Sequence, residues 1–138
     1  MYDIGRAITI EDTDSMTADM FEKLIAALYI KQGYEAYQTQ FVGDQGVDVI
    51  AKKSEAVIAI QAKCYNSPVG NSAVQEVVAG KSLYNATESM VITNNTFTPQ
   101  ARKLAESNNV ALCDRNMLKA YLLSFPIVHM DLMQVETK

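Results

Sequence analysis

Hydrophobic and polar residues alternate with two different periods along the chain, and the first is the period of a helix. Thr17 suits a helix N-cap, and Gly33 suits a helix end. Between them, apolar residues recur at spacings of three and four: Phe21, Leu24, Ile25 and Leu28. The pattern predicts a helix that packs this stripe on the core. Glu22 lies on the flank of the stripe, so we expect its carboxylate at the edge of the core.

The second pattern is typical of β-strands and lies in the middle of the chain. Three β-rich runs lie at residues 35–41, 47–52 and 56–65. They are separated by polar, turn-forming residues at 43–46 and 53–55. Their lengths suit antiparallel hairpins, so the pattern predicts a meander of three strands.

The second half of the chain alternates helices with buried strands. Ser72 opens a predicted helix, with Gln75 three residues later as in a capping box. Thr98 followed by Pro99 opens another predicted helix. The remaining predicted elements are strands at 90–93 and 110–113 and a helix at 118–123. The order α-β-β-β-α-β-α-β-α predicts an α/β fold with a mixed central β-sheet flanked by helices on both faces.

The two ends of the chain are less regular. Residues 1–15 end in an acidic run and are interpreted as an arm or short strand that leads into the first helix. Residues 124–138 suit either a further strand or a docking tail. The tail contains three apolar residues that pack on the chain's own core or form a subunit interface: Ile127, Leu132 and Val135. We interpret residues 1–138 as a single domain with a core at about 17–122.

Length and composition agree with one globular domain. The chain has 138 residues, of which 49% are hydrophobic and 20% are charged. No run approaches the roughly 20 apolar residues that span a bilayer, and the charged N-terminus does not suit a secretory signal. Cys64 and Cys113 lack the spacing of a zinc site or a disulfide framework. We therefore expect a cytoplasmic protein with no membrane partner.

One segment carries residues suited to chemistry. Gln61 and Lys63 are two positions apart in the predicted strand 56–65, so their side chains share one face of the sheet. A buried amide or ammonium group in such an apolar run needs partners. Asp48, on the neighbouring strand, is the nearest candidate. From the residues alone, either Asp48 and Lys63 form a structural ion pair that Gln61 caps, or the three form a catalytic site.

The order of these residues resembles a known family. Residues 43–51 and 60–65 resemble the catalytic core of the Mrr-type restriction endonucleases, a branch of the PD-(D/E)xK nuclease superfamily. Upstream, the likeness extends to Phe21 and Glu22. Downstream, it includes further segments in the order and spacing of the family: 69–70, 73–77, 91–94, 97–101 and 110–114. The likeness covers about residues 17–122 and implies a restriction-endonuclease-like fold.

The resemblance also implies roles for the residues. Asp48 would bind a divalent cation, Mg²⁺ with Mn²⁺ as a substitute, and Gln61 and Glu22 would complete the metal site. Lys63 would lie beside the attacking water and the scissile phosphate. Gln61 departs from most of the superfamily, which has a carboxylate there, and so leaves only two charged ligands.

The function implied is that of a Mg²⁺-dependent DNA endonuclease of restriction or repair type, acting as a homodimer or with a partner protein that supplies specificity. Tyr65 and Gln75 are expected to contact the substrate, although a capping box explains Gln75 equally well. The net charge of −4 weighs against nucleic acid as a partner, but a metal-dependent nuclease must concentrate carboxylates. The alternative is a noncatalytic DNA-binding or assembly module that keeps the nuclease fold.

Overall fold

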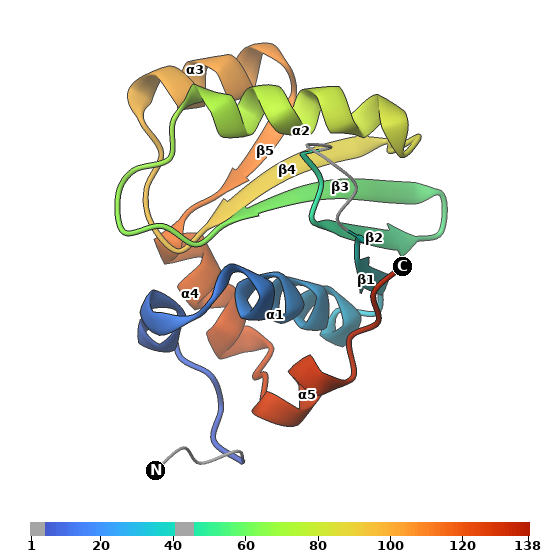
Figure 1. Ribbon diagram of the computed structural model, residues 1–138, viewed down its shortest axis with the longest axis vertical. Coiled ribbons are helices and arrows are strands. Elements are labelled where there is room, and N and C mark those ends of the chain that lie inside the picture. The colour runs from blue at the N-terminus through green and yellow to red at the C-terminus, as the bar shows by residue number, and fades with distance from the viewer. Residues whose placement is uncertain (1–4, 41–45) are drawn as a thin grey trace.

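The centre of the computed structural model is a mixed β-sheet (Figure 1). The structure describes residues 5–40 and 46–138. Within these ranges the sheet has five strands in the spatial order of their numbers: β1 (Glu35–Gln38), β2 (Val49–Lys53), β3 (Ala56–Lys63), β4 (Glu88–Thr93) and β5 (Val110–Cys113). β1, β2 and β3 pair antiparallel, whereas β3, β4 and β5 pair parallel. The predicted mixed sheet with its antiparallel meander is confirmed.

Helices cover both faces of this sheet (Figure 1). α1 (Ala18–Lys31) lies on one face, with α4 (Arg115–Ser124) and α5 (His129–Met133) on the same side. α2 (Asn71–Leu83) and α3 (Pro99–Ser107) lie on the opposite face. None of the helices in the described ranges is long and apolar enough to cross a lipid bilayer.

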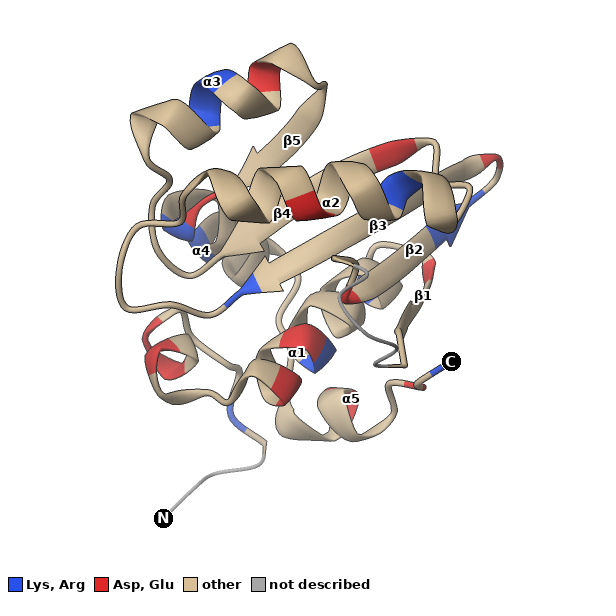
Figure 2. Cartoon of the chain, turned by 45° about the horizontal axis from the view of Figure 1, so that its top comes forward, with Lys and Arg blue, Asp and Glu red and all other residues tan. Residues whose placement is uncertain are grey.

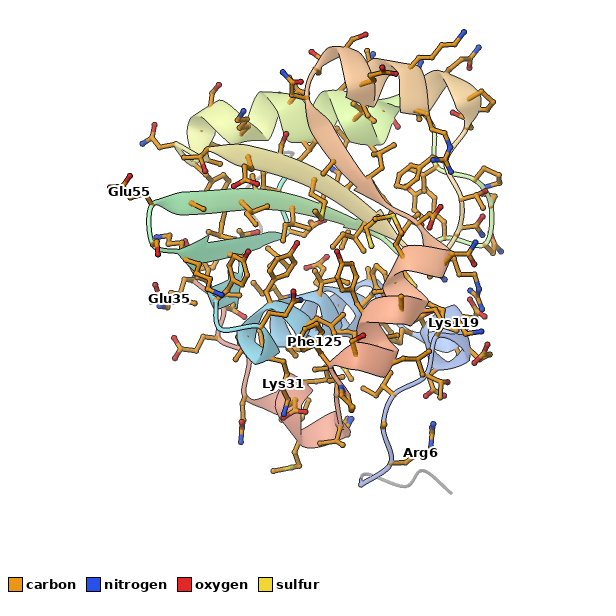
Figure 3. The ribbon with its side chains drawn as sticks, turned by 180° about the vertical axis from the view of Figure 1, so that it is seen from behind. Arg6, Lys31, Glu35, Glu55, Lys119 and Phe125 are labelled. Atoms are coloured by element: carbon orange, nitrogen blue, oxygen red, sulfur yellow. The ribbon has the colours of Figure 1, made fainter. Side chains whose placement is uncertain are left out.

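Apolar side chains fill the space on each face of the sheet. Phe21 of α1 and Ile60 of β3 are fully buried in the core on the α1 side. Val77 of α2 and Val91 of β4 are fully buried in the core on the α2 side. Figure 3 shows the molecule from behind. Phe125, which follows α4, is partly buried and packs against the core on the α1 side. The apolar stripe predicted for the first helix is therefore the centre of the larger core.

Side-chain caps explain where α1 and α3 begin. The hydroxyl oxygen of Thr17 accepts a hydrogen bond from the Met20 amide at 3.2 Å. The hydroxyl oxygen of Thr98 accepts one from the Ala101 amide at 3.1 Å, and Pro99 occupies the first turn. Each cap satisfies an amide that would otherwise lack a partner at the helix start. Both predicted helix starts are confirmed.

The start of α2 differs from the prediction. Gly70 is its N-cap in an extended conformation, and no side chain caps the helix. Ser72 already lies inside the first turn, where its hydroxyl is no longer at the N-cap position. The predicted capping box of Ser72 and Gln75 is therefore wrong. The side chain of Gln75 is exposed.

Both ends of the chain pack on the core next to α1. The N-terminal arm forms a short 3-10 helix, η1 (Glu11–Ser15), and not a strand, and Ile8 and Ile10 before it are buried. The tail residues whose packing the sequence left open are buried in the same core: Ile127, Leu132 and Val135. The main-chain amide of Ile8 donates to the carbonyl of Ile127 at 2.7 Å, so the two ends also contact each other.

The tail also extends the sheet at its β1 edge. Thr137 forms a parallel bridge with Gln38. The Gln38 amide donates to the Glu136 carbonyl, and the Lys138 amide donates to the Gln38 carbonyl, each at 2.9 Å. This pairing satisfies main-chain groups that an open edge strand would leave unpaired. The tail is therefore packed on the domain and is not a free docking segment: it contains the helix α5, and only its last residues pair with β1.

Gly46 fixes the approach of the chain to β2. The rest of the predicted turn at 43–46 lies outside the described residues. Gly46 has a φ of +69°, which a residue with a side chain adopts only at a cost. A Cβ atom at this position would lie 2.3 Å from the main-chain oxygen of Glu76 on α2. The segment before β2 therefore packs directly on the backbone of α2.

We predict that Gly46→Ala lowers the free energy of unfolding by about 2 kcal/mol, because it combines an unfavourable φ with a steric clash. Chemical denaturation would measure the change. Gly70→Ala is the matched control, since a Cβ atom there meets nothing within 4 Å and the φ is −101°. Equal stability of the two variants would contradict the close packing of Gly46 on α2.

Candidate active site

The candidate site lies where β2 separates from β3. The Asp48 amide still donates to the Ile60 carbonyl at 2.8 Å, which continues the antiparallel ladder by one bond. The next bond comes from a side chain, because Oδ2 of Asp48 accepts from the Ala62 amide at 2.8 Å. The carboxylate thus takes the place of a main-chain carbonyl and is held at the divergence of the two strands.

Gln61 and Lys63 project from β3 toward α2, as the period of two predicts. Ile58 and Ile60 pack on the opposite face, in the core with α1. Both polar side chains reach Glu76 on α2. Nε2 of Gln61 donates to Oε2 of Glu76 at 2.8 Å, and Nζ of Lys63 lies 3.7 Å from the same oxygen. The prediction that Gln61 and Lys63 share one face is confirmed.

The ion pair of Lys63 is not the one considered from the sequence. Its ammonium pairs with Glu76, and the described residues contain no ion pair between Lys63 and Asp48 within 4.0 Å. Asp48 is anchored by the Ala62 amide, so it does not need Lys63 as a structural partner. The interpretation of Asp48 and Lys63 as a direct ion pair capped by Gln61 is therefore wrong.

The amide oxygen of Gln61 has no partner. The side chain is 3% exposed, and Oε1 is buried without a hydrogen bond from any described residue. Leaving such an oxygen unpaired costs about 1–3 kcal/mol, so native proteins rarely do so without a reason. A carbonyl oxygen of this kind is a suitable ligand for a hard cation. The unpaired oxygen is thus an observation that points to a ligand in the site.

Carboxylates crowd the site, and two of them hold protons more tightly than usual. Burial is the main cause that raises the pKa of Glu22 on α1 from 4.5 to about 7, and the charges of Asp48 and Asp19 raise it further. Burial also raises the pKa of Asp48, while the Ala62 amide and the charge of Lys63 oppose that rise. A bound cation would relieve this concentration of negative charge.

These residues line one pocket of about 560 Å³. Its walls come from the first half of α1, the ends of β1 and β3, the residues just before β2, the middle of α2 and the tail. Figure 2 shows acidic positions on α1 and α2 on either side of the end of β3. The charged residues that line the pocket are Asp19, Glu22, Lys23, Asp48, Lys63 and Glu76. Four carboxylates face two ammonium groups there, so the pocket suits a cation better than a bare phosphate.

The structure brings together most of the predicted site residues. Asp48, Gln61, Lys63 and Glu22 all line the pocket, and so does Tyr65, whose ring centroid lies 5.6 Å from the Lys63 ammonium. Their catalytic, metal-binding and substrate-binding roles remain predictions. The predicted substrate residue on α2, by contrast, is exposed and does not line the pocket: Gln75.

Several residues of this pocket were not predicted from the sequence, and Glu76 and Gln38 are two whose side chains form hydrogen bonds with predicted ones. Glu76 lies three residues after Ala73 and four before Gly80, both buried, so the helical period alone places it beside the buried face of α2. Gln38 lies two residues after Ala36 on β1, and both face inward. A polar residue at an inward position of a strand was the signal for Gln38.

A divalent cation fits the residues present. Within the described ranges, no three His, Cys, Asp or Glu residues are placed to hold a metal ion together. The candidate donors are therefore the carboxylates of Asp48 and Glu22 and the unpaired Oε1 of Gln61. All three are hard oxygen ligands, and Mg²⁺ commonly takes few protein ligands and keeps several waters.

The amide of Gln61 gives the Glu76 carboxylate a hydrogen-bond donor, and the value of this bond for stability can be tested. A carboxylate there would lose the bond to Oε2 of Glu76 and place two acids in contact. We predict that Gln61→Glu lowers the free energy of unfolding by about 1–2 kcal/mol at pH 8 in a chelator. The double variant Gln61→Glu/Glu76→Gln restores one amide and one acid, so it should recover most of the loss in a urea denaturation series. A loss that the second change does not recover would contradict the pairing.

The fold and the pocket define a class of protein, and comparison with known families identifies that class. Together they define an α/β domain with a polar site at the divergence of two central strands. The model of the Mrr catalytic domain, described as restriction endonuclease, matches residues 13–122. The chain belongs to this restriction endonuclease family.

Solved structures share the fold. A protein of unknown function, AF1548, has a TM-score of 0.66 at 21% identity, over 78% of this chain and 66% of that one. The MspJI restriction endonuclease in complex with a 27-mer oligonucleotide has a TM-score of 0.61 at 23% identity, over 82% of this chain. The DNA modification-dependent restriction endonuclease AspBHI has a TM-score of 0.61 at 18% identity, over 90% of this chain.

These likenesses establish the restriction-endonuclease-like fold and no more. The chain spans only 29% of the MspJI chain and 40% of the AspBHI chain, so both relatives contain large regions without a counterpart here. The search of curated proteins gives no match.

Proposed function

We propose that the protein is a metal-dependent DNA endonuclease of restriction or repair type, and that the pocket at the end of β3 is its active site. One observation carries the proposal: a buried carboxylate, an unpaired amide oxygen and an ammonium group, from Asp48, Gln61 and Lys63, line a single pocket. Family membership supports nuclease chemistry. The oligonucleotide complex of MspJI and the DNA modification-dependent restriction endonuclease AspBHI support DNA as the substrate.

Asp48, Gln61 and Glu22 would hold a Mg²⁺ or Mn²⁺ ion. When bound, such a cation supplies a Lewis acid that neutralises charge on the phosphodiester and makes water acidic enough to attack near neutral pH. The Ala62 amide keeps the Asp48 carboxylate in place at 2.8 Å. The bond of Nε2 to Glu76 holds the side chain of Gln61 and leaves Oε1 as its free acceptor.

Lys63 would act on the scissile phosphate itself. Its ammonium lies 3.7 Å from Glu76, too long for a tight hydrogen bond, and the side chain is 19% exposed. The group is therefore free to donate to a phosphoryl oxygen or to orient the attacking water as negative charge develops. Tyr65, which is 43% exposed beside it, would contact the sugar or base next to the cut.

One centre of this kind hydrolyses one strand at a time. A cut through both strands of a duplex would then need two copies, so a homodimer fits double-strand cleavage. A partner protein that selects the target is the other route to specificity. Sedimentation of the protein alone and with a short duplex separates these two arrangements.

The function is tested by incubation with supercoiled, linear, single-stranded and branched DNA in Mg²⁺, in Mn²⁺ and in EDTA. We expect cleavage that requires a divalent cation and is lost in Asp48→Asn, because the neutral amide is a weaker ligand. Glu106→Gln, an exposed position on α3, is the matched control and should cleave normally. Binding without cleavage on every substrate would contradict the proposal and favour a noncatalytic DNA-binding module.

A further inference from the structure

We infer that Thr137 and Gln38 are positioning residues for the Glu22 carboxylate, so that the tail is part of the active site. The inference rests on the proposed function. Residues 136–138 lie beside β1 (Figure 1). Three main-chain hydrogen bonds hold them there, from Gln38 to Glu136, from Lys138 to Gln38 and from Gln40 to Lys138, at 2.9, 2.9 and 3.0 Å. Thr137 itself lines the pocket.

The side chain of Gln38 connects the tail to α1. It is only 6% exposed. Its Nε2 donates to Oε1 of Glu22 at 2.9 Å and to Oδ1 of Asp19 at 2.8 Å. Its own Oε1 accepts from the hydroxyl of Thr137 at 3.2 Å. One amide thus bridges two carboxylates on one side and a hydroxyl on the other.

This arrangement fixes which way the amide points. An ionised carboxylate only accepts hydrogen bonds, and Asp19 is ionised in its ion pair with Lys23. Nε2 of Gln38 must therefore face Asp19, and with it Glu22. Oε1 is then directed at the tail, in a buried place where it needs a donor. The Thr137 hydroxyl is the donor that meets it. Without that hydroxyl the amide oxygen is buried without a donor, so the Gln38 side chain is less firmly held and its bond to Glu22 is weakened.

The consequence for Glu22 is a fixed orientation. Only Oε1 is bonded, and no described residue bonds Oε2, which leaves that oxygen for a ligand in the pocket. The ammonium of Lys23 pairs with Asp19 at 2.6 Å. Gln38 therefore also donates to a second carboxylate that is held in place. Supporting hydrogen bonds of this kind typically change metal affinity or activity about 10-fold or more when they are removed.

The test compares Thr137→Val, which removes only the hydroxyl, with Thr137→Ser, which keeps it. In Thr137→Val we expect the dissociation constant for Mn²⁺ to rise about 10-fold and kcat for DNA cleavage to fall by a similar factor. KM for DNA should stay within about twofold, since Thr137 is argued to act on the metal site and not on DNA binding. Thr137→Ser should restore both values.

Thr87→Val is the matched control for a general loss of stability. Its hydroxyl bonds the main chain of Val57 at 2.9 and 3.1 Å, next to β3 and β4 and away from the pocket. It should change the unfolding midpoint as Thr137→Val does, without changing Mn²⁺ affinity.

Two failures can be told apart. If the unmodified protein binds Mn²⁺ and cleaves DNA, but Thr137→Val does both equally well, the positioning role is overturned and the proposed function stands. The same holds if Thr137→Ser is as impaired as Thr137→Val. If the unmodified protein neither binds Mn²⁺ nor cleaves DNA, the proposed function fails and the inference falls with it.

Discussion

Replacing Lys63 with methionine is expected to lower kcat for DNA cleavage about 10³-fold, because it removes the ammonium that meets the charge developing on the phosphate. Methionine keeps much of the length and the apolar stem of lysine. The bond from Gln61 to Glu76 does not involve Lys63, so the candidate metal ligands stay in place. Mn²⁺ affinity, measured by titration calorimetry, should therefore change by no more than about threefold.

Lys103→Met, on the exposed face of α3, is the matched control for the loss of one positive charge. It should cleave at the normal rate. Single-turnover kinetics separates the chemical step from DNA binding and product release. A Lys63→Met protein that cleaves normally would remove Lys63 from the mechanism, whereas one that loses only DNA affinity would make it a binding residue.

Glu22→Gln is expected to stabilise the metal-free protein at pH 8 by up to about 3 kcal/mol while it removes cleavage activity. The raised pKa of Glu22 means that the folded protein binds this proton more tightly than the unfolded chain does. Deprotonation above that pKa places a charge in a half-buried site next to Asp48 and Asp19. Glutamine carries no charge, and its side-chain oxygen still accepts the bond from Gln38.

The sign of the pH dependence follows from the pKa of Glu22, which burial raises from 4.5 to about 7. Its contribution to stability is fully present below pH 4.5, declines as the pH rises and is lost above about 7. Urea denaturation of both proteins in EDTA between about pH 4 and about pH 8 should give stabilities that coincide at low pH and separate as the pH rises. The other acidic residues are the same in both proteins, so their contributions to the pH dependence cancel in the difference between the two stabilities. A gap of constant size would contradict the raised pKa.

The elements that could be predicted are those with a local repeat. The stripe of Phe21, Leu24 and Ile25 identifies α1, and the spacing of Gln61 and Lys63 assigns both to one face of β3. Both patterns depend on neighbours within four residues, where the backbone period decides the direction of a side chain. Asp48 lies on another strand, so it was grouped with Gln61 and Lys63 through the predicted meander and the family resemblance.

The site residues that could not be predicted depend on the exact position of a helix and on contacts between residues far apart in the chain. The substrate role of Gln75 rested on the family resemblance, although the buried period of α2 favours Glu76 as the residue beside the pocket. Thr137 contacts the site through Gln38, which is 99 positions away in the chain. No periodicity links residues at that distance, because only the packing of the tail on α1 brings them together.

The pairing of Gln38 with Thr137 also determines when the site can form. The chain between them closes a loop of about a hundred residues, and such non-local contacts form late in folding. During synthesis, α1 and the first four strands leave the ribosome well before residues 136–138 do. A nascent chain can therefore pair its first strands while Glu22 is still unsupported, so the proposed active site would be complete only when the tail packs on α1 and β1.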